Sequence, residues 1–359
     1  MKLIEYIKEK RIDKIVDKYS KLFLKEIDSN KSILIEAFIK YYGEEYRNII
    51  TERLNNTYFY IFISDATIKQ IKKLIAENII NNTDIIRNIK KIIKYYGKNH
   101  ITAKFYCNGE DVQSKSVKNY TTEYFSNKKN SVGGHIVGTT IFNDQSSLIF
   151  ISFSQYFYDE TALIHEINHA IRSSNLAIYV DNNGKERIIT KNGIDIKNSE
   201  SNECIEIEEI IQHKATLEIL DFFHKLGGHI SIKPTNHLTS KYEKMFPLIE
   251  NFYKKYETIL KKAAITDNIN VLFSEIDKDK YEEYKRVICE QFPIIYDDNN
   301  NLSDKVINYV NNLVDQIGKK ENKKENIHKF IEELKASGKT INFFNSNVEE
   351  NNETKNKQR

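Results

Sequence analysis

The first hundred residues consist of apolar positions that recur every three to four residues and alternate with charged ones. This spacing places the apolar side chains on one face of an α-helix and the charged side chains on the other. Hardly a helix breaker interrupts it, so residues 1–100 are predicted to form a helical N-terminal region. Within it, the aromatic and β-branched run around Tyr58, Tyr60 and Phe62 indicates either a buried strand or the packed side of a helix junction.

The pattern changes between residues 101 and 158. The segments "ITAKFYC", "GGHIVGTTIF" and "SSLIFISFSQYF" are rich in β-branched and aromatic residues, and polar turn sequences separate them. Such segments favour strands, and the second and third are expected to form a hairpin through "NDQSS". Helical spacing returns at residues 159–172, where Asp159 or Thr161 is expected to cap the start of the helix.

The polar stretch 180–201 carries two Asn-Gly pairs, which are typical of a hairpin or a long loop. A further helix is predicted over residues 203–226. Residues 240–335 are again helical in pattern, with a break expected near Pro293 and the following "YDDNNN". The chain after Phe344 is almost free of apolar residues, and this composition favours disorder.

These patterns predict an α+β protein that is mainly helical and contains a small β-sheet. The predicted parts are a helical N-terminal region at 1–100, a core at 101–230, a helical C-terminal region at 231–335 and a disordered tail at 336–359.

Composition and charge exclude several classes of protein. The chain has 54 Lys and Arg against 51 Asp and Glu, interleaved along its length, so no basic patch indicates a nucleic acid partner. The cysteines, Cys107, Cys204 and Cys289, are widely spaced, which argues against a disulfide framework and against a thiolate metal site. No signal peptide or membrane-spanning run is recognised. We therefore expect a cytoplasmic protein without a membrane partner, with leaderless export left open.

The segment "ALIHEINHAI" carries the candidate chemistry. His165 and His169 are four residues apart, so on a helix both project from one face, with Glu166 beside them. The opposite arc is expected to hold the apolar positions Leu163, Ile164, Ile167, Ala170 and Ile171. Two histidines so placed can bind one metal ion. The alternatives are a coincidence of residues or two surface histidines on an ordinary helix.

The sequence "HEINH" matches the HExxH signature, and the chain resembles the zincin-type zinc metallopeptidases. The resemblance implies a zincin-like core in which His165 and His169 bind Zn²⁺ and Glu166 acts as the catalytic base. That glutamate would take a proton from the metal-bound water and pass it to the leaving amine. A peptide or protein substrate is implied, and the strand at residues 147–154 would be an edge that pairs with the substrate backbone. An ordinary strand paired within the protein is the alternative for this segment.

A catalytic zinc ion usually has three protein ligands. The long metzincin form of the motif is absent, since no third histidine follows within "HEINHAIRSSN". Downstream, "ECIEIEEIIQH" resembles the second helix of the gluzincins and minigluzincins, which supplies a glutamate ligand. Glu209 is the first choice, Glu208 the second and Glu206 the third. The family's ExxxD pattern is not met, because His213 stands four residues after Glu209.

Further residues are candidates for stabilising a transition state or orienting a ligand. They are His213 and Tyr242, with His237 as a weaker candidate. Tyr242 is one of 22 tyrosines, so a structural role for it stays open. Three other functions also stay open: a non-catalytic metal-binding or regulatory protein with a zincin-like fold, a helical scaffold without metal, and an amidase with the same zinc chemistry. The substrate, the position of cleavage and the oligomeric state are not assigned by any motif.

Overall fold

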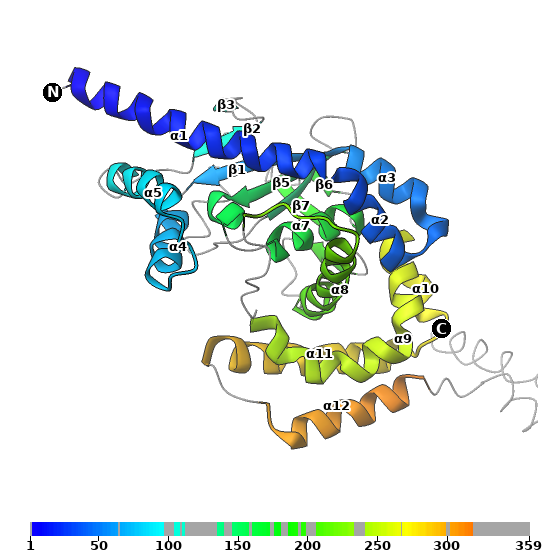
Figure 1. The fold of residues 1–359 in the computed structure, drawn as a ribbon. Helices are drawn as coiled ribbons and strands as arrows, with labels where there is room; N and C mark the ends of the chain where they lie inside the picture. Colours follow the sequence, from blue (N-terminus) through cyan, green and yellow to red (C-terminus); the bar gives the residue numbers. More distant parts are fainter. Residues whose placement is uncertain are drawn as a thin grey trace, which may run out of the picture.

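The computed structural model describes most of the N-terminal and C-terminal parts of the chain and separate segments between them. The described residues are 2–63, 65–96, 104–107, 110–111, 135–139, 146–157, 160–172, 176–180, 186–192, 195–198, 206–232, 241–266, 268–298 and 302–318. The architecture is mainly helical with β-sheet, as the α+β prediction requires (Figure 1). The tail predicted at 336–359 lies outside these residues.

The N-terminal part is helical, as predicted, except for one strand. Its elements are α1 (Lys2–Ser29), α2 (Lys31–Tyr42), η1 (Glu44–Tyr46), α3 (Arg47–Asn55), β1 (Thr57–Ile63), α4 (Asp65–Ala76) and α5 (Thr83–Tyr96). The aromatic run thus forms a strand that is buried only in part: Ile61, Phe62 and Ile63 are fully buried, whereas Tyr58 is 49% exposed. Buried β-branched and aromatic side chains suit a pleated surface that is covered on both sides.

A five-stranded mixed sheet is formed by elements from two predicted parts of the chain. Besides β1 it contains β2 (Lys104–Cys107), β3 (Glu110–Asp111), β4 (His135–Thr139) and β5 (Ser146–Ser152), in the order β3-β2-β1-β5-β4. β1 runs parallel to β5, and β4 runs antiparallel to β5. The expected pairing of the second and third strand segments is confirmed, while their turn lies outside the described residues.

One prediction about this sheet is wrong. The strand at residues 147–154 was expected to be a free edge, but β5 pairs with β1 on one side and with β4 on the other. Its backbone groups are therefore engaged within the protein and are not available to an added strand. The prediction fails because the sequence pattern indicates the hairpin partner β4 but not the partner β1, which is distant in the sequence. In the described part of the chain, β4 and β3 hold the two edge positions of this sheet, and β4 is the one next to β5.

The polar stretch after the histidine motif forms a separate antiparallel sheet. It consists of β6 (Leu176–Val180), β7 (Glu186–Asn192) and β8 (Asp195–Asn198), in that order. The hairpin predicted at 180–201 is confirmed by the pairing of β7 with β8. β6 is not predicted from the pattern, since periodicity alone does not distinguish its short apolar run from a helix.

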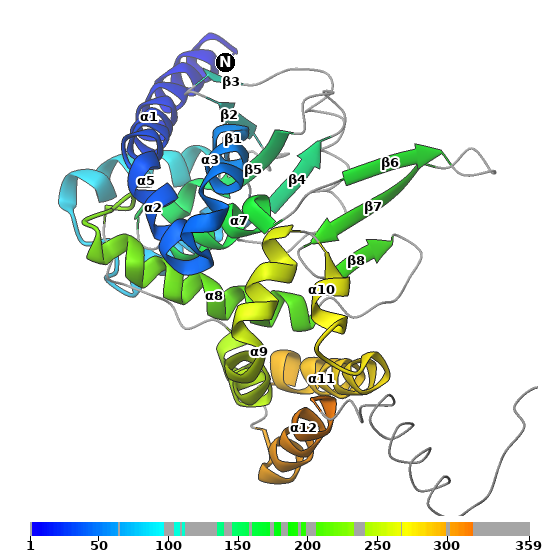
Figure 2. The same ribbon diagram turned by 90° about the vertical axis from the view of Figure 1, so that its right-hand side faces the viewer.

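Helices α7 (Thr161–Arg172) and α8 (Glu206–Lys225) pack against each other beside the large sheet (Figure 2). The short η2 (Phe153–Phe157) leads from β5 towards α7. Glu160 occupies the N-cap position, because its carbonyl oxygen accepts the Ile164 N–H at 2.9 Å. Thr161 is therefore inside the helix instead of capping it, and Asp159 lies outside the described residues.

The predicted apolar arc of α7 is confirmed. Each of its five members is at most 1% exposed: Leu163, Ile164, Ile167, Ala170 and Ile171. They join a core formed with α1 to α5 and with β1 and β5. α8 contributes to this core near its C-terminal end, through Ile219 and Phe223 among others, and to a second core near its start, through Ile207 and Ile210. α8 thus connects the sheet-containing part to the C-terminal helices.

The C-terminal helices pack around the second core. They are η3 (Lys241–Met245), α9 (Phe246–Thr266), α10 (Ile269–Phe273), α11 (Lys278–Asp298) and α12 (Asp304–Ile317). α11 continues through Pro293, and the break falls in the polar segment after Asp298. A proline removes one backbone hydrogen bond, which a long helix can tolerate. In the described part of the chain, no helix combines the length and the apolar run needed to cross a bilayer.

The burial of α7 leads to a stability prediction. Ile167→Ala should lower the free energy of unfolding by about 2–5 kcal/mol, because it leaves a cavity beneath the histidine helix. Ile7→Ala is the control, since Ile7 of α1 is 44% exposed and should change stability by only about 0.5 kcal/mol. Urea denaturation measures the free energy of unfolding of both variants. Equal decreases in the two would contradict the burial of Ile167 in the core.

Candidate metal centre

The histidine face of α7 is turned towards the protein interior. Glu166 and His169 are each 7% exposed, and the His165 side chain is 12% exposed. A surface helix would leave these polar groups in water. The structure therefore argues against two ordinary surface histidines, and the motif occupies a largely buried position.

Helix α8 brings Glu209 to the two histidines. Glu209 Oε2 lies 3.2 Å from His165 Nε2, and Glu209 Oε1 lies 3.5 Å from His169 Nε2. The two Nε2 atoms are 3.2 Å apart. The two imidazole nitrogens and the carboxylate are thus directed at one position, although Glu209 lies some forty residues after the histidines in the sequence.

These distances match the requirements of a tetrahedral ion. Two ligand atoms about 2.05 Å from Zn²⁺, at the tetrahedral angle, lie about 3.3 Å from each other. The two imidazole nitrogens are 3.2 Å apart, and they lie 3.2 and 3.5 Å from different oxygens of the Glu209 carboxylate, so each of these separations is close to that edge length. Imidazole nitrogen and carboxylate oxygen are also donors that zinc accepts in catalytic sites. The residues present therefore fit a zinc ion, with a fourth position left for water or substrate.

The electrostatics of the three side chains are strongly coupled. Burial favours the neutral form of Glu209, but the facing His169 and His165 outweigh it and hold the pKa of Glu209 well below its usual range. Burial lowers the pKa of His169, and the charge of His165 lowers it further. Burial opposes protonation of His165 too, yet its hydrogen bond to Glu209 raises the pKa of His165 overall. The carboxylate is thus held as an anion, the form that binds a cation.

Glu208, the second candidate, does not join this cluster. Glu208 forms an ion pair with Arg172, in which the two side chains are 2% and 3% exposed. Glu206 is the first residue of α8, and only its backbone is described. Of the two candidates whose side chains the structure describes, Glu209 is the one whose carboxylate lies beside the histidines.

A buried polar network holds α7 against α8 next to the cluster. Besides its ion pair with Glu208, Arg172 lies 3.4 Å from Gln212 Oε1. The Gln212 side chain in turn donates to the backbone carbonyl of His165 at 2.8 Å. One turn of α8 therefore contacts both the end of α7 and the backbone of a histidine of the motif. This arrangement fixes the register between the helices that carry the three donors.

Two residues from the N-terminal helices also position α7. The Tyr42 hydroxyl of α2 donates to Asn168 Oδ1 at 2.6 Å, so the second variable residue of the motif is tied to the core. Arg53 of α3 donates to the carbonyl oxygen of Ile171, in the last turn of α7. A cation at this end satisfies a carbonyl group without a helical partner and favours the helix dipole.

The other predicted residues lie around the same spot. His213 is 4% exposed, and its ring centroid lies 5.9 Å from that of His165. The ring of Tyr242 lies 6.5 Å from that of His165, with the planes 11° apart. His213 Nε2 is 3.4 Å from Glu243 Oε1, so η3 and α8 are in contact here. His237 lies outside the described residues.

The residues that support the cluster are not evident from the sequence. Arg172, Gln212, Tyr42 and Glu243 belong to four different elements, and their spacing carries no recognisable motif. One indirect indication of this network is present in the sequence. Arg172 and Glu208 fall on the inner faces of two amphipathic helices, and a buried charge needs a partner of opposite charge.

The buried ion pair yields a prediction about stability. Arg172→Met removes the partner of Glu208 and leaves a buried carboxylate, which should lower the free energy of unfolding by about 3–5 kcal/mol. The control is Lys225→Met, which breaks an ion pair at the surface: the Lys225 side chain is 64% exposed and that of its partner Asp221 is 55% exposed. That change should be about 0–1 kcal/mol. Urea denaturation measures the free energy of unfolding of the two variants. A similar small decrease in both would show that the buried network does not stabilise the protein.

The geometry of the donors yields a prediction about metal content. After loading with Zn²⁺ and desalting, His165→Ala and Glu209→Gln should each contain one zinc equivalent per chain fewer than the wild type, because each loses a ligand. Mass spectrometry of the metal content measures this. Glu257→Gln, at an exposed position of α9, is the control and should keep the wild-type content. An unchanged content in His165→Ala would exclude the cluster as a zinc site.

Comparison of the chain with known protein families, with curated proteins and with solved structures finds no match. The interpretation of the cluster therefore depends on its own chemistry. Three donor atoms of zinc-binding type converge from two packed helices, with a carboxylate, Glu166, on the same helix face.

Proposed function

We propose that the protein is a zinc-dependent metallopeptidase. Its metal ligands are His165, His169 and Glu209, and its substrate is a peptide or protein. The observation that carries the proposal is the convergence of two imidazole nitrogens and one carboxylate at 3.2–3.5 Å in a largely buried position. The resemblance to the zincins and gluzincins supports the same assignment.

The proposed chemistry divides between the ion and the protein. Bound Zn²⁺ supplies a Lewis acid that polarises the carbonyl of the scissile bond and acidifies water. Glu166 is the general base: it accepts a proton from the water that attacks the carbonyl carbon. It then acts as a general acid and gives this proton to the amine nitrogen as the C–N bond breaks. Its position next to His165, at 7% exposure, keeps bulk water from competing for that proton.

Residues of α8 and η3 are candidates for binding the developing oxyanion. The rings of His213 and Tyr242 are 5.7 Å apart and both neighbour His165. Both carry an N–H or O–H donor of the kind that stabilises such a charge. Since Glu243 contacts His213, this carboxylate would orient the imidazole.

Binding of the substrate backbone is assigned to a different strand from the one expected. Because β5 is paired on both sides, we assign substrate binding to the edge strand β4, which packs against α7. An extended peptide added along β4 would form backbone hydrogen bonds with little dependence on its side chains. Such binding leaves sequence selectivity to the residues around the metal.

A second candidate function is a metal-binding protein without turnover. Its supporting observation is that Glu166 and His169 are largely buried beneath neighbouring elements. A covered centre can hold an ion for structural or regulatory purposes without admitting a peptide. The two functions differ in the role of Glu166, which is essential for hydrolysis but contributes no ligand.

Glu166→Gln separates these functions. In a peptidase the substitution should lower the rate of peptide hydrolysis by about 10²–10⁴-fold while the zinc content stays at the wild-type level, because the amide cannot accept a proton. Activity against a library of quenched fluorescent peptides and metal content are measured on the same samples. Loss of activity together with loss of zinc, or a wild type that cleaves no peptide when fully loaded, would contradict the proposal.

A further inference from the structure

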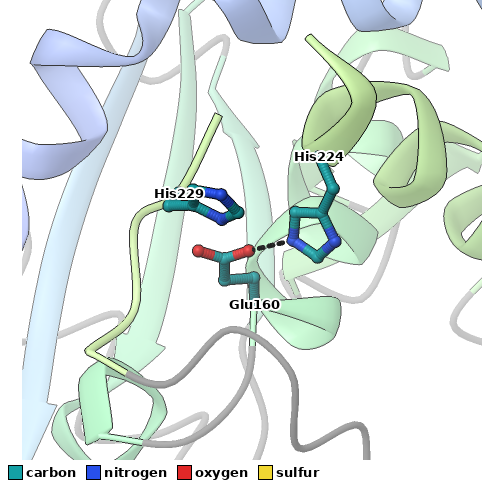
Figure 3. Close-up of side chains that lie close together, drawn as sticks. All are labelled: Glu160, His224 and His229. Atoms are coloured by element: carbon teal, nitrogen blue, oxygen red, sulfur yellow. Dashed lines mark hydrogen bonds and ion pairs between the residues drawn. The ribbon is translucent and has the colours of Figure 1, made fainter. Parts of the chain in front are cut away.

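A second group of metal-binding side chains lies at the other end of the α7–α8 pair. Glu160 precedes α7, His224 is in the last turn of α8, and His229 follows that helix (Figure 3). One ligand atom from each residue lies within 4.8 Å of the others. Figure 3 shows the carboxylate between the two imidazole rings, whose centroids are 5.2 Å apart. Glu160 is 1% exposed, the His224 side chain is 29% exposed, and His229 faces solvent.

Two glycines turn the chain so that His229 comes back to the end of α8. Gly227 has φ +84°, a left-handed conformation that favours glycine and ends the helix. At Gly228 a Cβ atom would lie 2.1 Å from the ring of Phe223, so only glycine fits there. The Gly228 N–H donates to the carbonyl oxygen of Phe223 at 2.9 Å, which closes the turn.

The backbone on both sides of the His229 ring is held by other residues. The Asn30 side chain donates to the His229 carbonyl oxygen at 2.9 Å and accepts the His229 N–H at 3.2 Å. Glu160 Oε1 accepts the N–H of Ile230 and, at 2.8 Å, that of Ser231. The backbone that carries the His229 ring is therefore held beside His224, which limits the positions that the ring can take.

The two oxygens of the Glu160 carboxylate have different partners. Oε1 binds backbone N–H groups, which orients the carboxylate in the way that outer partners orient metal ligands. Oε2 lies 2.5 Å from His224 Nε2 and is directed at the imidazoles.

We propose that Glu160, His224 and His229 form a second site for a divalent first-row transition metal ion, for which Zn²⁺ is the probe. Two imidazole nitrogens and one carboxylate oxygen suit such an ion, and the exposed side near His229 leaves a position for water. Binding would insert the ion between Glu160 and His224, replacing their direct hydrogen bond. The proposal does not rest on the peptidase function.

The second site is separate from the first and has a structural role. His224 follows Glu209 by 15 residues of α8, which corresponds to about 22 Å of helix, so the two groups do not share an ion. The ion would link three segments: the start of α7, the end of α8 and the loop after it. It would therefore stabilise the helix that carries the HExxH motif without contacting the reacting atoms.

The test is the zinc content of the full-length protein and of the His229→Ala variant. Loaded wild type should contain two zinc equivalents per chain, and His229→Ala should contain one, because the variant loses a ligand but keeps the backbone contacts of Asn30 and Glu160. The melting temperature without metal should be the same in both proteins, which shows that the variant folds. Lys225→Ala, at an exposed position of the same helix end, should keep both equivalents.

Further variants separate this site from the first one. His224→Ala should also lose one equivalent, whereas His165→Ala should lose a different one, so that the double variant His165→Ala/His229→Ala contains none. If the first centre does not bind zinc, the wild type contains a single equivalent that is lost in His229→Ala and kept in His165→Ala. Equal zinc contents in the wild type, His229→Ala and His224→Ala would overturn the proposal and leave Glu160 and His224 as a hydrogen-bonded pair only.

Discussion

The packing of α7 against α8 is the constraint on which the rest of the structure depends. The buried pair of Arg172 and Glu208, together with Gln212, holds the two helices in one register. A buried charge is strongly destabilising unless an opposite charge pairs with it. Sliding of one helix along the other would separate Arg172 from Glu208 and leave both charges buried without a partner. The same register brings Glu209 to the histidines. The position of the candidate zinc ligands is thus a consequence of a polar contact beside them.

Local patterns along the chain were sufficient for much of the fold and for part of the site. The spacing of apolar residues predicts both helices, and the five-residue motif predicts that His165 and His169 share a face. A choice among three neighbouring glutamates depends on the helical phase of α8 relative to α7, which is a property of the packed pair. Glu209 was the first choice by resemblance, and the structure brings it to the histidines while Glu208 turns to Arg172.

Long-range pairing explains where the sequence analysis failed. The pairing of β5 with β4 was predicted, but nothing in the sequence of β5 shows that β1, some ninety residues earlier, lies on its other side, so its assignment as an edge strand was wrong. Likewise, Glu160 and His224 are 64 residues apart and belong to no motif, although their side chains meet at 2.5 Å. Both cases involve contacts that form only after the helices and strands have packed.

The central claim is that His165, His169 and Glu209 bind one zinc ion. Anomalous diffraction at the zinc absorption edge, from crystals grown with Zn²⁺, locates bound zinc directly. The account predicts an anomalous peak among these three side chains, about 2.0–2.2 Å from each donor atom. A crystal of the zinc-loaded protein without a peak at this position would contradict the metal centre and the peptidase function that is built on it.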